Sequence, residues 1–263
     1  ASHVHPSNFA GVCSVLTALA SNFAAAFAGP VSDDLSDRLS ALFDSLDVSR
    51  TQRRALRKYF AVGHISGQHN FTAGEKALIR ALPVYEVYKR LDEKSLEALL
   101  LSAKDSEGTL DMPMMFVSLS AKGGSGKFMA PRGVQPCLLS HVFCSYADQD
   151  GDEALLQFLG VQLIRESAFY LLHVFPNVKT LPAAIRDEAL LSVLFKLPTL
   201  QLEDPSFKHN LQALHFVPVA DGSLMAPGDV FNPLIDQLVE ILHPNCFPVG
   251  EFMQADVVAA LES

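Results

Sequence analysis

The spacing of apolar residues constrains the fold of this chain more than any other feature of its sequence. Leu35, Leu39, Leu42, Phe43 and Leu46 recur at intervals of three and four residues, which places their side chains on one face of an α-helix. Similar apolar patterns recur along most of the chain. They predict helices over residues 7–28, 35–46, 49–63, 73–82, 92–103, 153–161, 165–175, 181–196, 204–214, 234–239 and 256–261.

Polar residues mark where several of these helices begin. Ser32, Asp33 and Asp34 offer an N-cap for the helix near residue 35, and acidic side chains there complement the helix dipole. Asp204 is predicted as an N-cap with Pro205 at the first helical position. The basic residues between 50 and 58 are interpreted as a solvent-facing side of their helix.

Two short apolar runs with turn residues predict β-hairpins. The first pairs residues 115–119 with 128–131 around a glycine-rich turn, and the second pairs 216–219 with 224–227 around an Asp-Gly turn. Because similar helices follow each hairpin, we expect an internal repeat and an elongated, repeat-like architecture. The predicted fold class is α+β and predominantly helical, with a helical subdomain at 1–105. A hairpin-plus-helices repeat region follows at 106–263, its second copy truncated at 263.

Composition excludes several classes of function. The chain has 263 residues, 49% of them hydrophobic, and 20 Lys and Arg against 29 Asp and Glu, so no broad basic face is available for nucleic acid. Four scattered cysteines do not form a disulfide framework, which predicts a reducing, cytoplasmic location. Polar residues interrupt the apolar stretch 9–29 and no Lys or Arg precedes it, so we expect neither a signal peptide nor contact with a membrane.

The ends of the chain suggest that it comes from a longer protein. It begins at Ala1 rather than Met and stops at Ser263 within a helical pattern. We therefore expect a fragment.

Two motifs resemble nucleotide and calcium sites but depart from them at required positions. In the run 121–128, Ala121 stands where a phosphate-binding loop needs its first glycine, and Phe128 replaces the hydroxyl residue after Lys127. When the glycine of the acidic run 148–152 is aligned with a calcium loop, Tyr146 and Gln157 fall on ligand positions. A hairpin turn and an acidic helix start are the preferred interpretations, and no cofactor is predicted.

Three residues are weak candidates for a metal site. Cys137, His141 and Cys144 would share one face if their segment were helical, and thiolate with imidazole is zinc chemistry. No fourth ligand is evident, and buried cysteine is a common core residue, so we expect no metal. No catalytic residues are identified by spacing, and we predict that the chain is not an enzyme.

Several segments resemble the repeat regions of the sacsin family in their order and spacing, over most of the chain after residue 35. They are LRKYF at 56–60, ALPVYEVY at 81–88, FVSL at 116–119, LGV at 159–161, FY at 169–170, and FVP at 216–218 with GSLMAP at 222–227. Sacsin-like proteins are very large, and each of their repeats begins with an ATPase-like module. This chain resembles the part that follows that module, and the module's Asp-x-Gly-x-Gly element is absent from the sequence.

The resemblance implies a protein-binding or scaffold segment of a chaperone or co-chaperone in protein quality control. Its partners would be non-native client proteins, other chaperones and neighbouring segments of the parent chain. A purely structural spacer between ATPase-like modules is one alternative, and an enzyme with an unrecognised hydrolytic or nucleotide site is another.

Aromatic and apolar residues near both ends are the candidates for contact with clients. They are Phe9, Phe23 and Phe27 in the N-terminal helix, and Phe247, Phe252 and Met253 near the C-terminal end. Phenylalanine at helical spacing is more often part of a core, so each of them has burial as its alternative.

Overall fold

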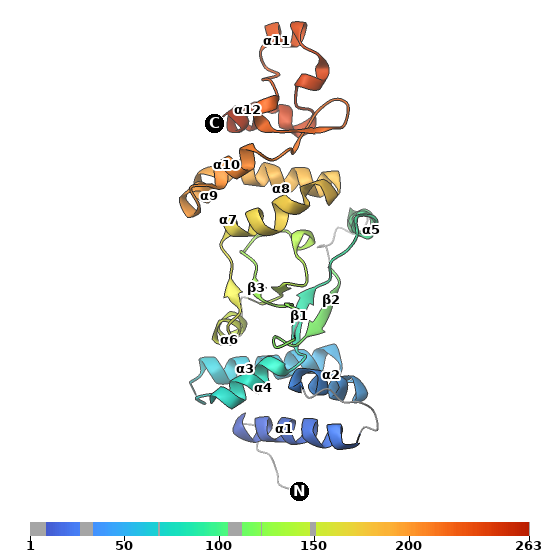
Figure 1. The fold of residues 1–263 in the computed structure, drawn as a ribbon, viewed down its shortest axis with the longest axis vertical. Coiled ribbons are helices and arrows are strands. Elements are labelled where there is room, and N and C mark those ends of the chain that lie inside the picture. Colours follow the sequence, from blue (N-terminus) through green and yellow to red (C-terminus); the bar gives the residue numbers. More distant parts are fainter. Residues whose placement is uncertain are drawn as a thin grey trace. The chain divides into compact units, whose positions relative to one another are not determined.

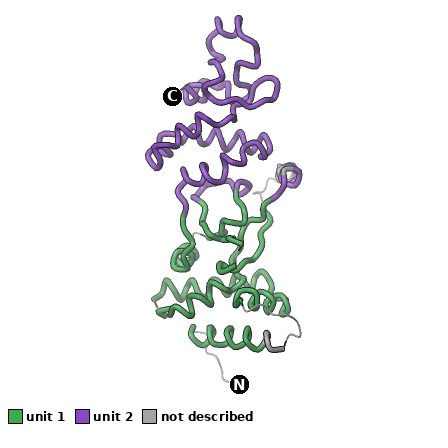
Figure 2. The backbone as a smooth tube through the Cα atoms, viewed as in Figure 1, with its two compact units in different colours: residues 1–90, 111–130, 139–163 green, residues 91–110, 131–138, 164–263 purple. Residues whose placement is uncertain are grey.

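The computed structural model describes residues 9–26, 34–67, 69–104, 112–121, 123–147 and 151–262. The chain divides into two compact units, coloured separately in Figure 2. Unit 1 comprises residues 1–90, 111–130 and 139–163, and unit 2 comprises 91–110, 131–138 and 164–263. The predicted boundary at residue 105 therefore does not coincide with the division of the structure, because chain segments from both sides of it enter each unit.

Helices and a small sheet make up unit 1 (Figure 1). Its helices are α1 (Phe9–Ala26), α2 (Leu35–Ser45), α3 (Arg50–Ile65), α4 (Ala73–Ala81) and α6 (Asp152–Phe158). Its strands are β1 (Tyr85–Tyr88), β2 (Met114–Val117), β3 (Phe128–Met129), β4 (Phe143–Cys144) and β5 (Gln162–Leu163).

Local capping explains where three of these helices begin. Asp34 accepts a hydrogen bond from the Ser36 amide at the start of α2, as the sequence predicts. Capping boxes begin α3 and α4, where Ser49 pairs with Gln52 and Thr72 pairs with Glu75. Each box supplies partners for backbone amides that the helix itself leaves unpaired.

The strands of unit 1 form a mixed sheet in the order β2-β1-β4-β3-β5. β1 lies antiparallel to both β2 and β4, whereas β3 runs parallel to β4 and β5. The first predicted hairpin is therefore wrong, because β2 pairs with β1 and not with β3. Residue 85 faces residue 117 in this ladder, so a partner distant in sequence replaced the local one.

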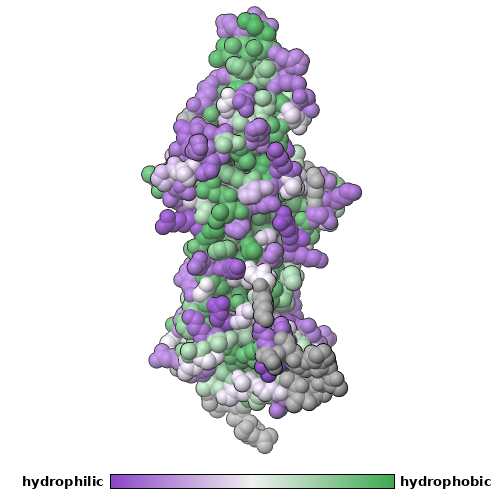
Figure 3. Space-filling model, viewed as in Figure 1, coloured by the Kyte–Doolittle hydropathy of each residue, from purple (hydrophilic) through white to green (hydrophobic). Residues whose placement is uncertain are grey.

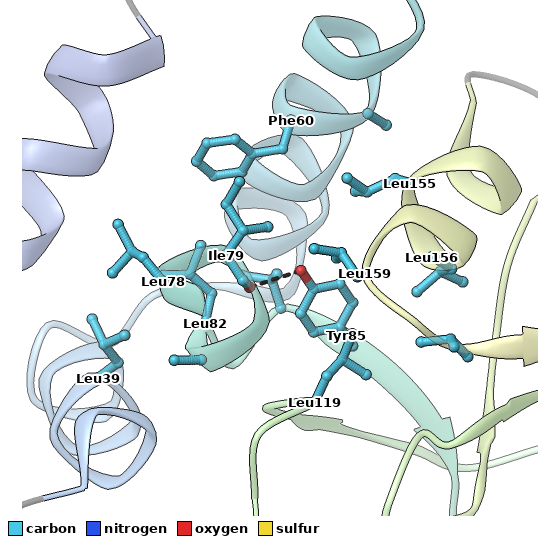
Figure 4. Close-up of a cluster of buried hydrophobic side chains, with 14 of the residues drawn as sticks. Leu39, Phe60, Leu78, Ile79, Leu82, Tyr85, Leu119, Leu155, Leu156 and Leu159 are labelled. Atoms are coloured by element: carbon cyan, nitrogen blue, oxygen red, sulfur yellow. Dashed lines mark hydrogen bonds between the residues drawn. The ribbon is translucent and has the colours of Figure 1, made fainter. Parts of the chain in front are cut away.

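The core of unit 1 lies where α3, α4 and α6 meet β1, as Figure 4 shows. Tyr85 is fully buried at its centre, and its hydroxyl donates a hydrogen bond of 2.8 Å to the Ile79 carbonyl oxygen. The phenol thus has a partner for the one polar group that burial would otherwise leave unpaired. Its neighbours in Figure 4 include Phe60, Leu82 and Leu159.

Ion pairs fix the basic side of α3, which is not the simple solvent-facing surface that the sequence predicted. Glu86 of β1 is only 5% exposed and accepts hydrogen bonds from Arg50 at 2.8 Å and from Arg54 at 2.7 Å. Arg57 is also buried and pairs with Asp152 at the start of α6. These contacts attach α3 to the sheet and to α6.

Unit 2 is helical apart from one hairpin. Its helices are α5 (Glu93–Lys104), α7 (Glu166–Phe169), α8 (Ala183–Phe195), α9 (Leu197–Glu203), α10 (Phe207–Gln212), α11 (Asp236–Ile241) and α12 (Ala255–Glu262). The hairpin joins β6 (Val217–Pro218) and β7 (Leu224–Met225). Between α7 and α8 the chain forms a π-helical turn (Tyr170–Val174) and a 3₁₀ helix (Phe175–Thr180).

Aromatic side chains contribute to the core of unit 2. Phe175 and Phe207 pack with their ring centroids 5.5 Å apart, and Phe216 packs against Phe252 at 6.1 Å. α8 contacts both α9 and α12. The order of elements confirms a predominantly helical α+β fold, and the second predicted hairpin is confirmed as well.

Two further expectations about this region are wrong. The two segments predicted to repeat fold differently, since one lies in the mixed sheet and the other in an isolated hairpin. α10 begins at Phe207 rather than Pro205, because the Asp204 carboxylate accepts hydrogen bonds from the amide and hydroxyl of Ser206 in a turn before the helix.

Candidate functional site

Several apolar side chains in and around α11 are exposed to solvent. The segment around α11 lies at the end of unit 2 farthest from α8 in Figure 1. The Phe231 amide donates a 2.8 Å hydrogen bond to the Cys246 carbonyl oxygen. This hydrogen bond brings the two ends of the segment together.

No residue of α11 is buried. Val239 is 49% exposed and Ile241 is 78% exposed, while Leu234 and Ile235 just before the helix are also exposed. In Figure 3 hydrophobic residues gather at this end of unit 2. We call Phe231, Leu234, Ile235, Val239 and Ile241 the α11 surface. Exposed apolar surfaces on folded proteins are often interaction sites.

A groove of about 490 Å³ adjoins the α11 surface and shares Phe231 with it. Its apolar lining comes from residues before α11, from the segment between α11 and α12, and from α12, namely Pro227, Val230, Phe231, Pro233, Pro248, Val258 and Leu261. Asn232 donates a 2.8 Å hydrogen bond to the Glu262 carboxylate, which joins two of these walls of the groove.

The chain segment that contributes most of the groove and the α11 surface is rich in acidic residues. Between residues 209 and 263 the sequence contains no Lys or Arg, although it contains seven Asp and Glu. They are Asp221, Asp229, Asp236, Glu240, Glu251, Asp256 and Glu262. An apolar site in an acidic surrounding favours apolar partners that carry positive charge.

The chain matches no protein-family model, no curated protein and no solved structure.

The sequence-predicted contact residues are mostly part of the core. Phe9 is 6%, Phe247 7% and Phe252 1% exposed, so these three cannot contact a client in this conformation, and that prediction is corrected. Phe9 lies in α1, Phe247 in an extended segment and Phe252 in a 3₁₀ helix, and each is packed into the core of its unit. Met253 is 46% exposed. The side chain of Phe23 and the whole of Phe27 lie outside the described residues.

The helical premise of the weak metal candidates is wrong. Cys137 lies in a 3₁₀ helix, His141 in a turn and Cys144 in β4, so they do not share a helical face. Burial raises the pKa of Cys137 to about 11 and that of Cys144 to about 12, and both changes oppose the thiolate that zinc requires. Within the described residues, no three His, Cys, Asp or Glu side chains are grouped to hold a metal ion.

The other two motifs are also placed by the structure. Strand β3, rather than the helix of a phosphate-binding loop, follows Lys127. Of the acidic run, residues 148–150 lie outside the described part, and Asp152 begins α6 with Gly151 as its N-cap. Across the ranges that the structure describes, no helix has both the length and the apolar character to cross a membrane.

Sequence reasoning missed the α11 surface because its apolar residues were interpreted as one helix of a repeat. A signal was present in the sequence. Apolar residues cluster between residues 230 and 242, and no Lys or Arg lies between residues 209 and 263.

Proposed function

We propose that this chain is a non-catalytic, protein-binding segment that holds apolar stretches of other proteins flanked by Lys or Arg. The observation that carries the proposal is the α11 helix, which buries none of its residues although Leu238, Val239 and Ile241 are apolar. Exposing such side chains to water is unfavourable, at about 25 cal/mol for each Å² of apolar surface. A partner that covers them recovers this free energy.

The groove beside α11 provides a second surface for an apolar peptide. Its volume is about 490 Å³, within the range of ligand pockets, and the hydrogen bond from Asn232 to Glu262 joins two of its walls. An extended peptide would place apolar side chains in the groove and on the α11 surface, with its basic residues near Asp236, Glu240 and Glu262. The acidic surrounding gives such a peptide both orientation and a faster association rate.

The resemblance to sacsin repeats supports a narrower proposal. Non-native clients expose apolar segments that native proteins bury, and these fit the groove and the α11 surface. We therefore propose a role in protein quality control as part of a sacsin-like chaperone or co-chaperone. The four cysteines are free of disulfide bonds, which supports a reducing compartment such as the cytoplasm.

A fluorescence-anisotropy titration tests the binding site. The probe is a labelled twelve-residue peptide with six leucine and phenylalanine residues between lysine pairs, and a second peptide carries glutamate pairs in their place. We expect saturable binding of the lysine peptide, and binding of the glutamate peptide that is about tenfold weaker at low salt.

A pair of substitutions assigns the binding to α11. Val239→Ser with Ile241→Ser should weaken binding of the lysine peptide about tenfold or more, because both side chains are exposed and available for contact. Leu202→Ser in α9 is the matched control, since Leu202 is 88% exposed but lies outside α11 and the groove lining. Equal losses in both variants, or no saturable binding at all, would contradict the proposed site and favour the spacer.

A further inference from the structure

A second pocket lies in unit 1, between the glycine-rich turn before β3 and the end of α4. Its volume is about 200 Å³. None of its lining residues is acidic, and two are cationic. The lining consists of Arg80, Leu119, Ser125, Gly126, Lys127, Phe128, Gly160, Val161 and Gln162.

Arg80 is held in this pocket by two backbone carbonyl groups. Its Nη2 donates to the Leu119 oxygen at 3.3 Å, and its Nη1 donates to the Leu159 oxygen. Gly160 allows this approach, because a Cβ at that position would stand 3.1 Å from Nη1. A guanidinium group has five N–H donors, so the two carbonyl bonds orient it and leave donors for a ligand.

Lys127 brings a second positive charge from the glycine-rich turn. Its side chain folds back over Gly124, where a Cβ would stand 3.0 Å from Nζ. Gly124 and Gly126 have φ values of +73° and +65°, a region that residues with a side chain rarely adopt. Glycine at 124 therefore allows both the turn and the folded-back lysine, and Lys127 itself is one of the lining residues of the pocket.

Arg80 and Lys127 make no ion pair within the part of the chain that the structure describes. Arg80 is half-buried, so its charge is only partly solvated. An anion bound in the pocket would be attracted by the charges of both Arg80 and Lys127.

We propose that this pocket binds a phosphate-class oxyanion, either inorganic phosphate or a small phosphomonoester. The planar guanidinium of Arg80 would bond two phosphate oxygens, Lys127 would act as a point charge, and the Ser125 hydroxyl would donate to the third oxygen. The pocket differs from a nucleotide loop, because a strand follows the turn. The site is independent of the α11 surface and of the function proposed for it.

Isothermal titration calorimetry of the whole chain with inorganic phosphate and, separately, with O-phosphoserine tests the proposal at a fixed ionic strength set with sodium chloride. We expect saturable one-site binding of at least one of them, and the tighter of the two identifies the source of the anion. Lys127→Gln should weaken that binding about tenfold, since one charge-assisted hydrogen bond is lost. Lys127 is exposed, so its replacement leaves folding intact.

Two further variants make the result decisive. Lys179→Gln removes the same charge from an exposed position in unit 2 and should leave the affinity unchanged. Arg80→Lys keeps the positive charge but loses the planar guanidinium that can bond two oxygens at once, so it should weaken binding about tenfold. Circular dichroism checks that this variant is folded. Absence of one-site binding, or equal losses in the Lys127 and Lys179 variants, would overturn the proposal.

Discussion

Arg57 of α3 and Asp152 of α6 form an ion pair in which both side chains are largely removed from water. The Nη2 to Oδ2 distance is 2.6 Å, and the side chains are 6% and 17% exposed. Arg57 also donates to the Ser145 carbonyl oxygen at 3.0 Å, and its guanidinium lies over the Tyr85 ring. This pair therefore joins segments that are 95 residues apart in the sequence.

Breaking this pair should be costly. Replacing Arg57 by Ala leaves the Asp152 carboxylate without its partner in a poorly solvated position, and we expect the free energy of unfolding to fall by about 3 kcal/mol. Urea denaturation measures this change. Lys58→Ala is the control, because Lys58 is exposed on the next position of α3 and should change stability by less than about 0.5 kcal/mol.

Gly63 should not tolerate a side chain although it lies inside a helix. A Cβ at Gly63 would overlap the ring of Phe9, which packs against α3 from α1. We expect Gly63→Ala to lower the free energy of unfolding by about 2 kcal/mol, because the overlap outweighs the better helix propensity of alanine. Gly74→Ala in α4 is the matched control, since no atom lies within 4 Å of the added Cβ. A stability gain in both variants would show that Phe9 does not occupy this position.

Local signals were sufficient to predict the helices and several of their caps. Asp34 and Ser49 stand where the sequence indicated helix starts, since capping depends on residues within one turn. The sheet could not be predicted in this way. β1 carries Glu86 among apolar residues, and only its pairing with Arg50 and Arg54 explains a buried carboxylate there.

The candidate site likewise depends on contacts between distant segments, which local sequence patterns do not reveal. Exposure of Val239 and Ile241 depends on how far α11 stands from the other elements of unit 2, and helical spacing alone does not contain that information. Burial of Phe247 and Phe252 likewise results from packing against distant segments. The absence of Lys and Arg after Lys208, in contrast, can be read directly from the sequence.

Glu86 should make stability depend on pH below its ordinary pKa. Burial alone raises the pKa of this carboxyl group, but hydrogen bonds and charges from Arg54 and Arg50 outweigh it and hold the pKa below 4.5. The folded state therefore binds the proton less readily than the unfolded chain does. The stabilisation is fully present above the unfolded-state pKa and is lost as pH falls through the lower folded-state value.

Glu86→Gln should remove the loss of stability that protonation of Glu86 causes at low pH. We expect the free energy of unfolding at pH 7 to fall by about 2 kcal/mol, and its decline below pH 4.5 to become shallower. Thermal melts between pH 3 and pH 7 measure both effects. If the free energy of unfolding of the variant fell as steeply below pH 4.5 as that of the original protein, other carboxylates would control the decline.

The buried thiols should be slow to react. Burial raises the pKa of Cys13 to about 11 and that of Cys144 to about 12, so both remain protonated at pH 8. Mass spectrometry after iodoacetamide treatment should show both unmodified in the native protein and modified in 6 M guanidinium chloride. Fast native modification of either residue would mean that its thiol is accessible and ionised.

The central claim is that an exposed apolar surface on unit 2 binds non-native protein. Light scattering of a heat-aggregating client with basic residues beside its apolar segments, titrated with this chain and without nucleotide, tests it most directly. We predict that aggregation is suppressed at near-stoichiometric ratios and that suppression is lost in the Val239→Ser, Ile241→Ser double variant but kept in Leu202→Ser. Scattering equal to that with an inert control protein would contradict the claim and leave this segment as a structural spacer.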